Sequence, residues 1–76
     1  MLTNGQLKIL VLIAQGKTYK EIAEIEHISW HTVKNRMRYA KKKTNTKSIA
    51  QCLVWAFNNH FLEIKKDIVC INKGAE

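Results

Sequence analysis

The strongest constraint on the fold of this 76-residue chain is its lack of proline, combined with apolar residues that recur at helical spacing. The chain has only three glycines, so few positions favour a break within a helix. Apolar side chains three and four residues apart share one face of a helix, and that face packs against the rest of the molecule. We therefore predict an all-α domain over residues 1–60, followed by a tail, 61–76, whose structure is left open.

Two short helices are predicted in the first third of the chain. The first spans about 3–15, and Gly16 follows it as a residue that adopts a left-handed conformation easily. Its apolar face comprises Leu7, Leu10, Val11 and Ala14. Thr18 and Glu21 then fit a capping box, in which the hydroxyl accepts a backbone N–H and the carboxylate reaches back to the cap. A second helix is expected from this cap to about Glu26.

A third helix is predicted over about 29–43, with Ser29 as its N-cap. Val33, Met37 and Ala40 form its buried stripe at i, i+4 and i+7. A short helix, a tight link and a second, basic helix together have the outline of a helix-turn-helix. A fourth helix is expected over about 46–59, so the predicted domain has four helices.

The charge of the chain is concentrated in one stretch. Its net charge is +7, and between His27 and Leu62 there are seven basic residues and no acidic one. The basic residues are Lys34, Arg36, Arg38, Lys41, Lys42, Lys43 and Lys47. A concentrated positive field attracts a polyanion. Any single lysine could be a solvated surface charge, but a cluster without acids favours a nucleic-acid surface.

The third helix presents side chains suited to the major groove of double-stranded DNA. Lys34, Asn35 and Arg38 lie on the face away from the buried stripe, and they are our candidates for base contacts. Lysine and arginine can bind the acceptors of guanine, and asparagine can pair with the edge of adenine. The candidates for phosphate contacts are Lys20, Trp30, His31, Thr32, Arg36, Lys41, Lys42 and Lys43.

Three segments carry a resemblance to a known family. They are Leu2-Thr3, the run LIAQGKTYKEIA over 12–23, and the run ISWHTVKNRMR over 28–38. Over about residues 2–57 the chain resembles the GerE/LuxR-type DNA-binding domain, a winged-helix-like fold without a wing. The resemblance implies a stand-alone transcription regulator that binds inverted-repeat DNA as a dimer through its fourth helix. It also implies that Lys34, Asn35 and Arg38 occupy the family's DNA-facing positions.

The chain departs from the family pattern near the first and second helices. Gly5 and Gln6 stand where the family usually has Arg and Glu, and Glu26 stands where it commonly buries Leu. An unpaired buried carboxylate is costly. We therefore expect either that Ile25 turns inward instead, or that Glu26 pairs with a neighbour such as His27 or an arginine.

Further departures lie in and after the third helix. Arg36 replaces the usual His, Lys43-Thr44-Asn45-Thr46 replaces the link "KLGV", and Ile49 replaces a frequent Arg. We expect the fold to survive these changes and the DNA preference to shift.

The fourth helix is apolar on more than one side. Ile49, Cys52, Leu53 and Ala56 form one stripe. The proposed dimer interface comprises Gln51, Val54, Trp55 and Phe57, which would meet their copies across a two-fold axis. Alternatively, Trp55 and Phe57 fold under the tail. The tail itself can be read as a helix or, at 68–71, as a short strand.

Other classes of function have little support in the sequence. No catalytic set or glycine-rich phosphate loop is visible, so we expect neither an enzyme nor a cofactor. His27 and His31 lack a third ligand, and Cys52 and Cys70 are expected to be reduced and mostly buried, which leaves no metal site. We also expect no signal peptide, no membrane span, no small-molecule ligand domain and a cytoplasmic location. The remaining alternative is an anti-activator or adaptor that forms a heterodimer with a related regulator through the fourth helix.

Overall fold

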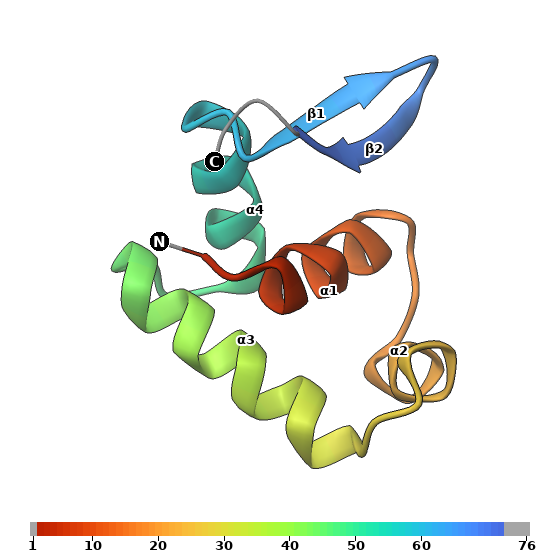
Figure 1. Cartoon of the computed structure of the whole chain (residues 1–76). Helices are drawn as coiled ribbons and strands as arrows, with labels where there is room; N and C mark the ends of the chain where they lie inside the picture. The colour runs from red at the N-terminus through yellow and green to blue at the C-terminus, as the bar shows by residue number, and fades with distance from the viewer. Residues whose placement is uncertain (1, 73–76) are drawn as a thin grey trace.

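A computed structural model describes residues 2–72, which form four helices followed by a β-hairpin (Figure 1). The helices are α1 (Asn4–Ala14), α2 (Tyr19–Glu26), α3 (Trp30–Thr44) and α4 (Ile49–Asn58), and the strands are β1 (Leu62–Lys65) and β2 (Ile68–Ile71). The predicted four-helix fold is confirmed. No helix within 2–72 combines the length and the apolar character that a membrane crossing requires.

Side-chain caps fix the starts of the first two helices. The Thr18 hydroxyl accepts the backbone N–H of Glu21 at 3.2 Å, and the Glu21 carboxylate accepts the N–H of Thr18 at 2.9 Å, so the predicted capping box is confirmed. Thr3 and Gln6 make the same reciprocal pair at the start of α1, at 3.2 and 2.8 Å. The amide of Gln6 takes the place of a carboxylate there, so this second box carries no charge.

The turns around α3 rely on left-handed residues other than glycine. His27 ends α2 with φ 55°, and Asn45 ends α3 with φ 55°. Asn45 occupies the place of the family's glycine, and asparagine tolerates this conformation better than most residues. Ser29 caps α3 as predicted, because its hydroxyl accepts the N–H of Thr32 at 3.1 Å.

The predicted start of α4, at about residue 46, is too early. The helix begins at Ile49 because Ser48 is its N-cap and accepts the N–H of Gln51 at 3.1 Å. The Gln51 side chain in turn accepts the N–H of Lys47 at 2.8 Å. The local hydrogen-bonding of serine and glutamine therefore sets the boundary.

The core lies where α1, α2, α3 and α4 meet. Its largest fully buried side chains are Ile9, Leu10, Ile22, Val33, Met37 and Cys52. The predicted stripe of α3, which includes Val33, Met37 and Ala40, is buried. The prediction for α1 is partly wrong, because Ala14 is exposed and Ile9 is fully buried. The buried face of α1 is rotated towards Ile9 and Gln6.

The tail forms an antiparallel hairpin. Leu62 pairs with Ile71, and Lys65 pairs with Ile68 across a two-residue turn at Lys66 and Asp67. The strand alternative for 68–71 is therefore confirmed, and the helical one is wrong. β2 packs against α1 and β1 against α4, so the hairpin adds a small sheet to the four helices.

Neither arrangement expected at Glu26 is found among residues 2–72: Ile25 does not turn inward, and Glu26 forms no ion pair. Ile25 is 46% exposed, so it does not turn inward. Glu26 is half-buried, and the structure records no ion pair for it within residues 2–72. Glu26 is among the residues that line an apolar hollow between α1 and β2.

Candidate nucleic-acid interface

The outward face of α3 gathers the predicted base-contacting residues in one place. Lys34, Asn35 and Arg38 are all exposed. They line a shared hollow of about 360 Å³ between α2 and α3, together with Tyr19, His31, Met37 and Lys41. Because the hollow lies along a helix without acidic residues, it is suited to a negatively charged or acceptor-rich ligand.

Trp30 holds Lys34 at the start of this face. The ammonium of Lys34 lies 4.8 Å from the centroid of the indole ring, which is a cation–π contact. His31 meets the same ring edge-on, with centroids 5.2 Å apart and an interplanar angle of 74°. Trp30 is 41% exposed, so it can support Lys34 and still contact a ligand itself.

Two tyrosines were missing from the set predicted from the sequence. Tyr19, the first residue of α2, lines the same hollow as Lys34 and Arg38, and burial raises the pKa of its hydroxyl. Tyr39 is 51% exposed, and the guanidinium of Arg38 lies 5.4 Å from the centroid of its ring. Their positions in the sequence could have identified both residues. Tyr19 follows a helix cap, and Tyr39 directly follows Arg38 on the outward side of α3.

The predicted phosphate contacts are spread along α2 and α3. Lys20, His31, Lys42 and Lys43 are exposed, and Lys41 is half-buried. Thr32 is half-buried, and its hydroxyl shares a 2.8 Å hydrogen bond with that of Ser29. Thr32 is thus already part of the cap of α3.

Arg36 points away from the other basic side chains of α3. It is half-buried, and its guanidinium packs over Gly5 at the start of α1. A Cβ added at Gly5 would lie 3.3 Å from Nη1 and 3.6 Å from Cζ of Arg36. The missing side chain at Gly5 therefore makes room for the guanidinium.

None of the acidic residues of α2 lines the hollow between α2 and α3. Hydrogen bonds from the backbone and then the side chain of Thr18 lower the pKa of Glu21, and the charge of Lys17 adds to the effect. The Glu21 carboxylate is already hydrogen-bonded as part of the α2 cap.

Within residues 2–72, no three His, Cys, Asp or Glu side chains cluster in a way that could hold a metal ion.

The residues predicted for a dimer interface have different surroundings. Val54 is 58% exposed, while Trp55 and Phe57 are half-buried. Trp55 stacks on Phe61, with centroids 5.4 Å apart and planes inclined by 13°, so the tail covers part of this face. Gln51 is exposed, but its side chain caps α4. Val54 is the one residue of the four whose side chain is largely free of other described contacts.

Comparison with known proteins adds a family to this geometry. The model of the GerE family, described as bacterial regulatory proteins of the luxR family, matches residues 1–56. The response regulator protein VraR of Staphylococcus aureus is 33% identical over 63 residues, which is 83% of this chain and 30% of that protein. VraR proteins of Staphylococcus saprophyticus and Staphylococcus epidermidis show the same identity and coverage. The chain thus spans about 30% of the length of these relatives.

Proposed function

Because this chain belongs to the luxR family of bacterial regulatory proteins, whose helix-turn-helix domains bind DNA, we propose that it recognises a specific DNA sequence with α3 in the major groove. The observation that carries the proposal is the shared hollow on α3. Lys34, Asn35 and Arg38 are exposed within it, and α3 has no acidic residue. Their donors match the acceptors of guanine and the edge of adenine.

The proposed binding unit is a homodimer on an inverted repeat. Val54 gives α4 an exposed apolar residue that a two-fold contact would bury. Two recognition helices related by such an axis would enter successive major grooves, with half-sites about 10 base pairs apart. Phosphate contacts by Lys20, Lys41, Lys42 and Lys43 would set the orientation of each copy.

Selection of bound sequences from random DNA tests this proposal directly. We expect an inverted repeat, with half-site spacing that reports the two-fold axis. Binding should weaken with salt, with log K falling by about 0.9 per neutralised phosphate for each log unit of salt. Recovery of no preferred sequence would contradict the proposal.

A charge-matched pair of variants separates base reading from general attraction. Lys34→Ala with Arg38→Ala should abolish the preference for the selected site over random DNA. The control, Lys8→Ala with Lys66→Asn, removes the same charge from exposed positions outside α3, and asparagine tolerates the positive φ of Lys66. The control should lower the affinity for both DNAs equally and keep the preference. An unchanged footprint in the first variant would refute the assigned roles.

The exposure of Val54 also favours a second candidate, an adaptor that pairs through α4 with a related regulator. The two candidates differ in one measurement. An adaptor would yield no selected site alone and would change the footprint of a luxR-family partner when mixed with it.

A further inference from the structure

We propose that the outer edge of β2 is a second self-association surface, on which two copies of this chain join their β2 strands antiparallel across a two-fold axis. The hairpin lies beyond residue 56, where the match to the family model ends. The pairing is independent of the proposed DNA recognition and of the proposed contact through α4.

The backbone of β2 has unpaired groups along this edge. The N–H of Asn72 donates to the carbonyl of Phe61 at 2.9 Å, so hydrogen-bonded pairs alternate along the hairpin from that point. In this alternation Ile68 and Cys70 bond to β1, while Val69 and Ile71 direct their N–H and C=O groups outward. Within residues 2–72, the structure records no partner for these outward groups. They are the donors and acceptors that an added strand would use.

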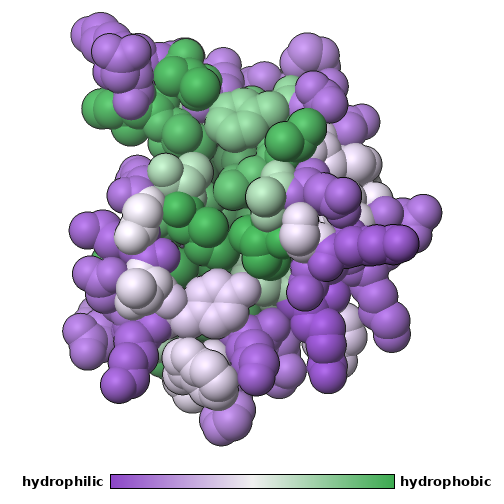
Figure 2. Space-filling view, turned by 180° about the vertical axis from the view of Figure 1, so that it is seen from behind, coloured by the Kyte–Doolittle hydropathy of each residue, from purple (hydrophilic) through white to green (hydrophobic). Residues whose placement is uncertain are grey.

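An apolar hollow lies between β2 and α1. It measures about 330 Å³ and is lined by Lys8, Val11, Leu12, Glu26, Val69, Cys70 and Ile71. In the view from behind, hydrophobic side chains form a band down the middle of the molecule, and the band reaches the projecting end of the hairpin (Figure 2). Apolar side chains of an added strand would therefore meet apolar surface.

β2 carries none of the side chains that usually prevent an edge strand from pairing. Edge strands are usually shielded by charges, proline or a bulge. β2 reads Ile68-Val69-Cys70-Ile71 and has none of these, whereas β1 carries Glu63 and Lys65, whose side chains pair at 3.3 Å. The hollow has a single cation, Lys8, balanced by Glu26, and this does not favour DNA, which binds where several cations gather.

A second copy of this chain fits the edge by symmetry. In an antiparallel pair centred on Cys70, Val69 faces the partner's Ile71, and the outward groups of both strands form four hydrogen bonds. The rim of the hollow carries one cation, Lys8, and one anion, Glu26, with no ion pair recorded for either within the described residues. A rim with one charge of each sign is self-complementary under a two-fold rotation, because Lys8 can face the partner's Glu26.

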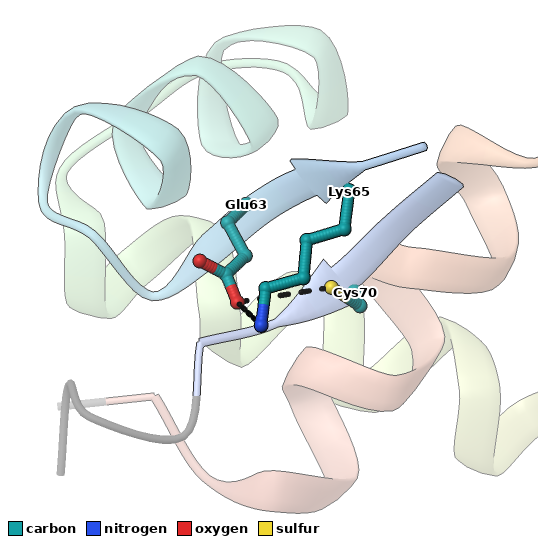
Figure 3. A network of polar contacts seen from close by, with 3 residues as sticks. All are labelled: Glu63, Lys65 and Cys70. Atoms are coloured by element: carbon teal, nitrogen blue, oxygen red, sulfur yellow. Dashed lines mark hydrogen bonds and ion pairs between the residues drawn. The ribbon is translucent and has the colours of Figure 1, made fainter. Parts of the chain in front are cut away.

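This register places the two Cys70 side chains opposite each other. Cys70 lies on the same face of the hairpin as Glu63 and Lys65, and its Sγ is 3.9 Å from Oε1 of Glu63 (Figure 3). Directly opposed residues that do not exchange hydrogen bonds have Cα atoms about 4.5 Å apart. A disulfide accepts Cα separations from about 4.4 to 6.8 Å. The pairing can therefore be trapped at one predicted position.

Cross-linking of the reduced full chain with diamide tests the register. Two thiols lose two protons and two electrons to diamide, which becomes the hydrazine, and the product is a Cys70–Cys70 disulfide. We expect a linked dimer on a non-reducing gel for the natural sequence and none for Cys70→Ser. The matched control is Val69→Cys with Cys70→Ser, which moves the thiol one residue out of register and should link at least tenfold more slowly. Equal linking by this control, or no linking by the natural sequence, would overturn the proposal.

Sedimentation of the reduced protein tests the pairing without a covalent trap. Val69→Pro removes the outward N–H but no bond within the hairpin, and proline is tolerated at such edge positions. Val69→Ala removes the side chain and keeps the N–H. In a Val54→Glu background, which removes the proposed contact through α4, we expect Val69→Pro to abolish the remaining association and Val69→Ala to weaken it.

Helical circular dichroism of each variant, and its binding to an isolated half-site, check that the fold persists. If Val54→Glu proteins with and without Val69→Pro sediment identically, a second copy does not occupy the edge. Because DNA site selection is measured separately, failure of this proposal and failure of the proposed function are distinguishable.

Discussion

At the scale of single residues, the contact between Arg36 and Gly5 joins two departures from the family pattern. The resemblance predicts Arg at position 5 and His at position 36, whereas this chain has glycine on α1 and arginine on α3. The guanidinium of Arg36 lies over Gly5, in space that a side chain on α1 would otherwise use. Arg36 remains a proposed phosphate contact, and its reach towards DNA begins from the α1 side of α3.

Trp30 offers a prediction at this scale. Trp30→Ala should weaken binding to the selected DNA by about two- to fivefold, because an exposed cation–π contact contributes about 0.5–1 kcal/mol to the placement of Lys34. Gel-shift titration measures the change, and Trp30→Phe, which keeps a ring, should lose less.

The effect of Trp30 should depend on Lys34. In a Lys34→Ala background, Trp30→Ala should have a smaller effect, since the two residues share one contact. Equal effects in both backgrounds would mean that Trp30 acts on DNA by itself.

At the scale of elements, the two capping boxes differ in charge although their geometry is the same. Gln6 closes the box of α1 with a neutral amide, and Glu21 closes that of α2 with a carboxylate. Only the start of α2 should therefore respond to acid. Since α2 and α3 together form the helix-turn-helix, this response would reach the DNA-binding unit.

The capping of α2 should weaken at low pH. The pKa of Glu21 in the folded protein is lowered by its hydrogen bonds to Thr18, so the stabilisation is fully present above the unfolded pKa of about 4.3. It is lost as pH falls through the lower folded pKa. Hydrogen exchange of the amides of α2, measured from pH 6 downwards, should show increased opening relative to α1 below pH of about 4.

Glu21→Gln is the matched control for this prediction, because Gln6 shows that glutamine closes the same box. The variant should remove the difference in acid response between α1 and α2. A difference that persists in the variant would assign the acid response to another group.

The sequence predicts elements well where the decisive interactions are local. Periodicity located α3 and its buried stripe, and the pair Thr18 and Glu21 located the start of α2. The start of α4 was misplaced because its cap is Ser48, whose hydroxyl accepts the N–H of Gln51. The tail was ambiguous because its apolar residues fit two periods, and the choice depends on pairing between β1 and β2 and on packing against α1.

In the candidate site too, features set by local sequence were predicted, and features that depend on distant segments were harder to predict. The exposure of Lys34, Asn35 and Arg38 followed from helical phase alone. The contribution of Tyr19 was missed, because it depends on segments brought together by the fold. The partial cover of Trp55 by Phe61 agrees with the alternative in which Trp55 folds under the tail, which the sequence alone did not decide.

At the scale of the whole molecule, the proposed DNA-binding face lies on α3, whereas the proposed self-association edge lies on β2. α1 packs against α3 on one side and against β2 on another, so the hairpin edge is separated from the DNA-facing helix (Figure 1). α4 packs against β1. If both proposed two-fold contacts form, they would link DNA-bound dimers into longer arrays, because two different symmetric contacts on one chain need not close.

The contact through α4 gives a prediction for the assembly. Val54→Glu should convert dimer to monomer in a Cys70→Ser, Val69→Pro background, because it places a carboxylate where an apolar residue would be buried. Sedimentation over a range of protein concentrations measures the change.

Val54→Ala is the control for size and should weaken association without abolishing it. A Val54→Glu protein that associates as the parent does would remove α4 as the interface. Its affinity for an isolated half-site should stay unchanged, because α3 is not altered.

The placement of the two tryptophans gives the recognition helix and the junction of α4 with the hairpin one optical reporter each. Trp30 is 41% exposed at the start of α3, and Trp55 is half-buried against Phe61, the residue that precedes β1. Emission from an exposed indole lies at longer wavelength than emission from a shielded one. Replacing either residue by phenylalanine leaves one emitter, so events at the recognition helix and at the hairpin can be followed separately in the same solution without an added dye.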